Sequence, residues 1–213
     1  MITIPRFSHG RAAATLALAL AAAGCRLAPT AGVAPARPSA AATLGFVPDL
    51  PVSSPPFRAV HTSWKQRLDQ PYVYLEHRGS YTGTGALLAT VHREMIVQGL
   101  EPSGPPFALF YDDPAQVPVV DLHSRACMPV AGVRAPQAPL AYEVLPSQTV
   151  VYAYVSGPYP EAPRAYPGLF AYLAKMGWLQ RGPVREIYLV PPTATASFED
   201  LIAEIQLPAT SGP

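Results

Sequence analysis

Gly79-Ser80-Tyr81 and Gly157-Pro158-Tyr159 are one short motif, Gly-x-Tyr, that occurs twice at a distance of 78 residues. Other landmarks return at almost the same distance, which random composition rarely produces. A repeat of this length is too long for a solenoid unit and suits a half-domain that is used twice. Two such halves around a pseudo-twofold axis are expected to leave a groove between them, and grooves bind ligands. The other pairs are Gly99 with Gly177, Tyr111 with Tyr188, Pro114 with Pro191, and Pro129 with Pro208.

The first half is expected to run strand, helix, strand, strand. Residues 72–77 are rich in β-forming side chains and end near Gly79, where a turn is predicted. A helix is predicted over 84–98, and strands over 107–112 and 117–127. The apolar stripe of this helix consists of Leu88, Val91 and Met95.

The second half repeats this order. Strands are predicted over 149–155, 185–190 and 200–207, with a helix that begins near Pro163. The stripe of this helix consists of Tyr166, Leu169 and Leu173, each 78 residues after its counterpart.

The sequence therefore predicts an α+β fold made from a duplicated βαββ module. The two halves are expected at about residues 70–129 and 148–208. Antiparallel strands should carry the helices on one side of the sheet and a central groove on the other.

The N-terminus has the layout of a lipoprotein-type signal peptide, predicted over residues 1–24. A basic head that ends at Arg11 precedes twelve residues, 12–23, which are all Ala, Leu or Thr. This run is too short to span a bilayer about 30 Å thick. Cys25 follows Ala-Ala-Gly, and the pattern predicts that it carries lipid and anchors the chain in a bacterial envelope, on the periplasmic face of the inner or outer membrane. The alternatives are an ordinary cleaved signal peptide or a small buried cysteine.

The remaining chain is expected to form an Ala/Pro-rich tether, residues 25–57, and one domain, residues 58–208. The chain has 15 Lys and Arg against 14 Asp and Glu, so its net charge of +1 offers no basic field for nucleic acid. If Cys25 carries lipid, Cys127 has no disulfide partner and is expected to be a small buried side chain. The five histidines show no metal-ligand spacing, and no cofactor is predicted.

Several motifs resemble the GyrI-like small-molecule-binding family, within the SOUL superfamily. This family includes the effector-binding domains of AraC- and MerR-type multidrug regulators. The resemblance covers about residues 60–208 and implies a duplicated βαββ fold with a central groove for hydrophobic, often cationic, small molecules. Some free-standing members resemble small-molecule hydrolases. The motifs are YVYLEHRGSY at 72–81, Tyr-Asp-Asp-Pro at 111–114, Gly-Pro-Tyr at 157–159, and Arg-Glu-Ile-Tyr at 185–188.

Glu186 is the main candidate site residue. Side chains alternate along a strand, so Glu186 and Tyr188 share one face. The more apolar pair, Ile187 and Leu189, is expected to face the helices, which directs Glu186 into the groove. The resemblance implies that this carboxylate attracts a lipophilic cation, and the alternative is a solvated Glu on an open sheet. The predicted groove also contains Tyr74, Tyr111 and Tyr152, and at an offset of 77 the counterparts of Glu186 and Tyr188 are Leu109 and Tyr111.

Three functions from different classes remain open. The favoured one is an envelope-tethered, non-enzymatic binder of a small amphiphilic molecule. The second is a hydrolase of small electrophilic compounds with Glu186 as general base. The third is a structural or interaction lipoprotein with a degenerate groove.

Overall fold

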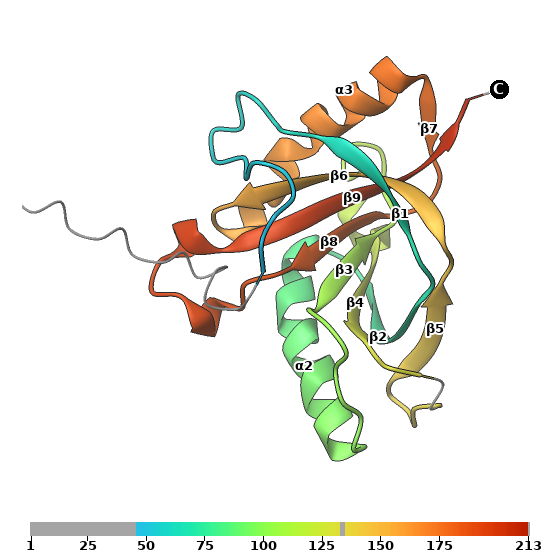
Figure 1. Ribbon diagram of the computed structural model, residues 1–213. Coiled ribbons are helices and arrows are strands. Elements are labelled where there is room, and N and C mark those ends of the chain that lie inside the picture. The colour runs from blue at the N-terminus through green and yellow to red at the C-terminus, as the bar shows by residue number, and fades with distance from the viewer. Residues whose placement is uncertain (1–45, 133–134, 213) are drawn as a thin grey trace, which may run out of the picture. The chain divides into compact units, whose positions relative to one another are not determined.

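The computed structural model describes residues 46–132 and 135–212 (Figure 1). The predicted signal peptide, Cys25 and residues 25–45 of the predicted tether lie outside the described residues. The strands are β1 Ser63–Arg67, β2 Gln70–Arg78, β3 Phe107–Phe110, β4 His123–Pro129, β5 Ala141–Leu145, β6 Gln148–Ser156, β7 Trp178–Gln180, β8 Val184–Tyr188 and β9 Ile202–Ser211, and the α-helices are α2 Thr84–Val97 and α3 Tyr166–Met176.

The strands form one sheet, in which every pair of named strands is antiparallel. Their order is β1-β6-β9-β8-β3-β4-β2-β5, and β7 also pairs with β9. The predicted α+β class is therefore confirmed. None of the helices in the described residues is long and apolar enough to cross a bilayer.

The strand register confirms the duplication. β2 pairs with β4 as β6 pairs with β9, and β3 lies directly beside β8, so the pseudo-twofold axis passes between these two strands. Gly79 and Gly157 occupy equivalent turns, with φ of 113° and 114°. Their N–H groups donate to equivalent carbonyls, those of Leu122 and Leu201, at 2.9 and 3.0 Å. Positive φ at both turns explains why each motif begins with glycine.

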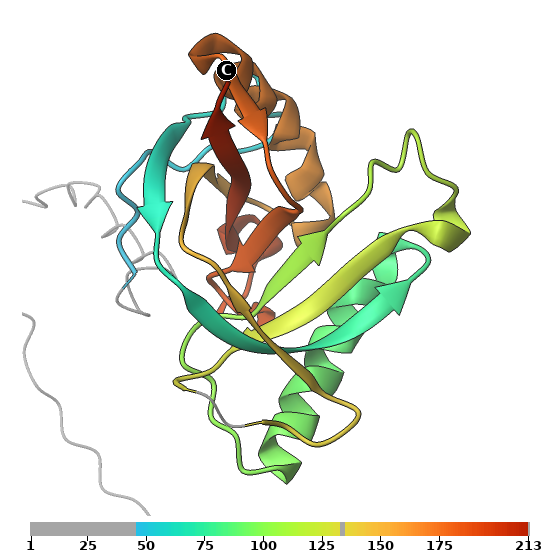
Figure 2. The same ribbon diagram turned by 90° about the vertical axis from the view of Figure 1, so that its right-hand side faces the viewer.

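Each repeat contains one strand more than predicted. β1 and β5 lie 78 residues apart and are equivalent, although neither was expected. Each pairs with the other half: Ser63 lies opposite Tyr152, and Ala141 lies opposite Tyr74. Figure 2 shows β1 and β2 as an almost continuous run of chain that passes from one half to the other. The repeat is therefore ββαββ, and the two halves exchange their first strands.

Both faces of the sheet are buried. On one face α2 contributes Val91 and Met95, and α3 contributes Leu169 and Leu173, to two apolar clusters. We call this the helix face and the opposite one the far face. The centre of the far face is filled by its own side chains, so the open groove predicted there is wrong. These side chains are Tyr72, Phe107, Leu109, Cys127 and Ile187. Cys127 is buried and free, as predicted.

The predicted tether extends too far toward the domain. Residues 46–57, which we call the strap, pack against the second half. Phe46, Leu50 and Val52 contact a cluster that contains Tyr152 and Tyr154 on the far face. The N–H of Ser53 donates to the carbonyl of Tyr154 at 2.9 Å. Proline content alone suggested a solvated chain, but the apolar residues between the prolines bury enough surface to order it.

Candidate ligand-binding site

Glu186 lies on the helix face beside the pseudo-twofold axis and is only 3 % exposed. Two tyrosine hydroxyls hold its carboxylate. Tyr166 donates to Oε1 at 2.7 Å, and Tyr188 donates to Oε2 at 3.0 Å. Both carboxylate oxygens are thus hydrogen-bonded, as a buried polar group requires.

Local structure explains how these three side chains meet. Glu186 and Tyr188 are two residues apart on β8 and therefore point to the same face. Tyr166 is the first residue of α3, directly after a 3-10 helix over Tyr159–Ala165. Across the axis the residue opposite Glu186 is Ala108 on β3, which contributes only a methyl group.

Burial raises the pKa of Glu186 to about 7, although the hydrogen bonds from Tyr166 and Tyr188 oppose this shift. The pKa values of both tyrosines are raised well above their ordinary value by burial, and the neighbouring Glu186 carboxylate raises them further. Within the described residues no Lys, Arg or His forms an ion pair with Glu186. At neutral pH the site thus contains a carboxyl group that is close to half-ionised and has no counter-ion.

The Gly-x-Tyr tyrosines pack beside this site as structural anchors. The ring of Tyr159 lies 4.6 Å from that of Tyr188, and the ring of Tyr81 lies 4.8 Å from that of Phe110. Each motif hydroxyl donates to two carbonyl groups at strand ends. Those for Tyr81 belong to Asp112 and His123, and those for Tyr159 belong to Val190 and Ile202.

The two halves differ in polarity at this site. The register places β3 and β8 at an offset of 78, so the counterparts of Glu186 and Tyr188 are Ala108 and Phe110. The predicted counterparts, Leu109 and Tyr111, are wrong by one residue. The second half contributes a carboxylate and hydroxyls where the first half contributes apolar groups. Tyr166 was predicted only as part of the helix stripe, and its place at the start of α3 gave no signal of a polar role.

The predicted orientation of Glu186 is also wrong. Glu186 and Tyr188 face the helices, whereas Tyr74, Tyr111 and Tyr152 lie with the far face. The strand alternation was right, but the choice of side was not. Ile187 and Leu189 pack into the apolar clusters of the far face, so hydrophobicity does not identify the helix side of this sheet. The structure therefore separates the predicted site into two groups on opposite faces.

The far-face tyrosines pack against ion pairs of opposite polarity. Arg125 lies 4.2 Å from the Tyr74 ring centre and pairs with Glu143 and Glu76. At the equivalent place, Lys65 lies 3.9 Å from the ring of Tyr152 and pairs with Glu204 at 2.7 Å. Tyr111 stacks on His123 with ring centres 4.3 Å apart. Among residues 46–132 and 135–212, no group of three His, Cys, Asp or Glu side chains is arranged to hold a metal ion.

The fold and this site define a small-molecule-binding α+β domain. The GyrI-like small molecule binding domain matches residues 64–210, and the chain belongs to that family. Among curated protein sequences, none matches this chain.

Solved structures agree with this fold. The C-terminal domain of EcmrR has a TM-score of 0.65 at 18 % identity, over 72 % of this chain and 99 % of that domain. SAV2435, solved bound to tetraphenylphosphonium, gives 0.51 at 14 % identity, over 70 % and 93 %. A hydrolase encoded by lin2189 from Listeria innocua gives 0.50 at 10 % identity, over 75 % and 100 %. At these identities the likeness establishes the fold.

Proposed function

We propose that this domain binds a small amphiphilic cation at Glu186, between hydroxyl groups of the second half and apolar groups of the first. The observation that carries the proposal is a buried carboxylate that no basic side chain of the described residues pairs with. Such a charge is costly to bury, and a ligand cation would supply the missing counter-ion. Family membership supports binding of a small molecule, and the cationic class is our inference from the charge.

Aromatic rings strengthen the case for a lipophilic cation. Tyr159, Tyr166 and Tyr188 lie on the second half beside the carboxylate, and Phe110 and Ala108 lie across the axis. Ring faces attract cations, and apolar groups receive the rest of such a molecule. Tetraphenylphosphonium, the ligand in the SAV2435 structure, has this chemistry and is a suitable probe.

The test is the substitution Glu186→Gln, which removes the charge and almost none of the volume. We expect tetraphenylphosphonium to bind about tenfold or more weakly to this variant, because an interaction with a charged partner contributes about 1.5–3 kcal/mol. Isothermal titration calorimetry gives the two dissociation constants. Triphenylphosphine oxide serves as a neutral ligand of similar shape, and its affinity should change little.

Equal weakening of both ligands would point to a damaged fold rather than a lost charge. If Glu186→Gln leaves the affinity for the cation unchanged, Glu186 is not its counter-ion and the proposal fails. Binding of neither ligand to the wild type would instead favour the structural lipoprotein with a degenerate site.

Hydrolysis is the second candidate, and the Glu186 pKa of about 7 favours it. A general base needs a pKa near the working pH and a hydrogen-bonding partner, and Tyr166 provides that partner at 2.7 Å. Native mass spectrometry separates the two functions. A binder releases its bound molecule chemically unchanged, whereas a hydrolase releases it with one water added.

We further propose that the domain is held at the bacterial envelope by lipid on Cys25. The support is the sequence pattern before this cysteine. Metabolic labelling with palmitate should mark the wild-type protein in its native host and leave Cys25→Ala unlabelled. Label of equal strength on both proteins would place the lipid elsewhere.

A further inference from the structure

Two arginines on the far face point toward one neutral acceptor. Arg67 Nη2 donates to Gln70 Oε1 at 2.6 Å, and Arg185 Nη1 donates to the same oxygen at 3.4 Å. Arg185 is only 2 % exposed, and Arg67 is partly exposed. Within the described residues neither forms an ion pair with a carboxylate. Two positive charges therefore meet at an amide oxygen that cannot neutralise them.

Hydrogen bonding beside this pair is also incomplete. Arg185 Nε has no hydrogen-bond partner in the part of the chain that the structure describes, and neither has Gln206 Oε1. Gln206 lies directly opposite Arg185 on β9. Burial, together with the positive charge of Arg67, lowers the pKa of Arg185 to about 10, which still leaves it charged at neutral pH. A buried guanidinium of this kind requires an acceptor, preferably an anionic one.

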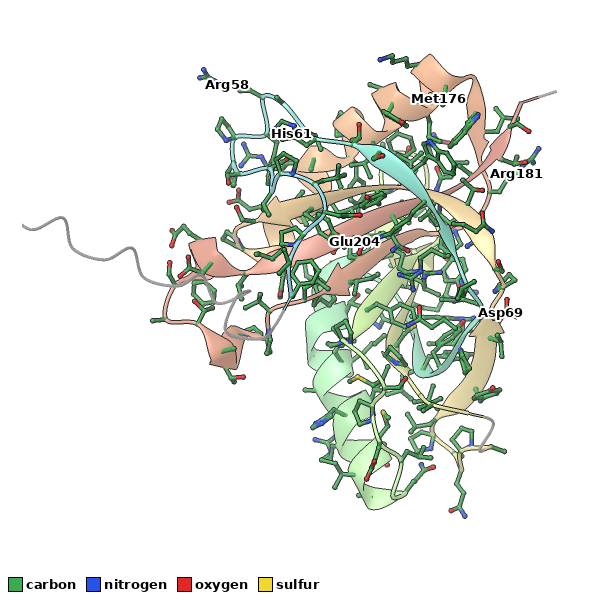
Figure 3. The ribbon with its side chains drawn as sticks, in the orientation of Figure 1. Arg58, His61, Asp69, Met176, Arg181 and Glu204 are labelled. Carbon is green, nitrogen blue, oxygen red and sulfur yellow. The ribbon has the colours of Figure 1, made fainter. Side chains whose placement is uncertain are left out.

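The neighbouring charges do not fill this role. Lys65 and Glu204 pair with each other, and Glu143 pairs with Arg125. Asp69, labelled with Glu204 in Figure 3, accepts from the backbone N–H of Ser147 through Oδ1 at 2.5 Å. The uncompensated positive charge on this face thus belongs to Arg67 and Arg185.

Apolar groups lie beside the two arginines. The guanidinium of Arg185 is 5.6 Å from the centre of the Phe107 ring. Leu145 lies directly opposite Gln70 and packs against the far-face cluster. At an offset of 78, Leu145 is the counterpart of Arg67, just as Phe107 is the counterpart of Arg185 with the offset reversed. The far face is therefore cationic on one side of the pseudo-twofold axis and apolar on the other.

We propose that Arg67 and Arg185 bind the carboxylate of a small amphiphilic anion, whose apolar part lies against Leu145 and Phe107. A planar guanidinium matches a carboxylate through two parallel hydrogen bonds, and Arg185 Nε supplies one that is unused. Arg67, being partly exposed, is the first point of contact from solvent. This site lies on the face opposite Glu186 and selects the opposite charge, so it is independent of the proposed cation site.

Decanoate and 1-naphthoate are the probes, and both are titrated by calorimetry below any micelle concentration. We expect both carboxylates to bind the wild type and decyltrimethylammonium to lack this dependence on the arginines. Arg67→Gln should weaken decanoate by about tenfold to a hundredfold, since it removes a charged hydrogen-bond donor. Arg185→Met should weaken it at least as much.

Arg93→Gln is the matched control, because it removes one arginine charge from α2 at a side chain that is 67 % exposed. It should leave decanoate affinity unchanged. Arg185→Met alters a buried position, so Arg67→Gln decides the outcome if that variant does not fold. Tetraphenylphosphonium binding to Arg67→Gln should persist, which would show that the helix-face site is intact. Unchanged decanoate affinity in Arg67→Gln, or no binding of either carboxylate to the wild type, would overturn the proposal.

Discussion

Tetraphenylphosphonium should bind roughly a hundredfold more tightly at about pH 8 than at about pH 5. The reason is the Glu186 carboxyl, whose pKa burial raises to about 7. A proton and the ligand cation compete for the same carboxylate, so the apparent affinity falls about tenfold for each pH unit below the pKa. Above the pKa the carboxylate is ionised and the affinity should level off.

Calorimetry across this pH range checks the effect, because the probe itself does not titrate. Glu186→Gln should bind weakly at every pH, with little dependence on pH. Loss of folding does not explain the expected loss at low pH. The folded pKa of Glu186 lies above its ordinary value of 4.5, so its contribution to stability is fully present below pH 4.5 and is lost as the pH rises through 7. A wild-type affinity that does not vary with pH would show that Glu186 is not the cation's partner.

The parts of the fold that the sequence predicts well are those set by local rules. The turns at Gly79 and Gly157 need positive φ, and glycine adopts it without strain. The two apolar stripes have the period of a helix, and α2 and α3 follow them. Repetition strengthened each of these signals, since every landmark occurs twice in one chain.

The parts that the sequence does not predict depend on contacts between distant residues. β1 and β5 are short strands that pair only with the other half, so nothing within either half indicates them. The side of the sheet that Glu186 faces was inferred from hydrophobicity, which fails because both faces are buried. Tyr166 reaches Glu186 only through the packing of α3 on β8. Local patterns thus identified the acid and one tyrosine of the site, whereas tertiary packing determined their partners.

The strap offers the second large effect. Replacing Phe46, Leu50 and Val52 together by Ala should lower the free energy of unfolding by about 3 kcal/mol. Each side chain is partly buried on the far face, and a fully buried apolar side chain of this size contributes about 1.5–3 kcal/mol. For a domain of this size the melting temperature should fall by about 6–12 °C. Urea unfolding followed by tryptophan fluorescence measures the change, because Trp64 and Trp178 lie within the folded domain.

Val47→Ala is the matched control within the same segment, because Val47 is 82 % exposed and should contribute almost nothing. A solvated tether that reaches residue 57 would make the triple variant as stable as this control, and that result would contradict the packed strap. The hydrogen bond from Tyr152 to Asp49 Oδ2, at 2.7 Å, fixes the strap at its polar end. The loss should therefore exceed what three independent surface substitutions produce, since removing the apolar contacts also frees the chain that carries Asp49.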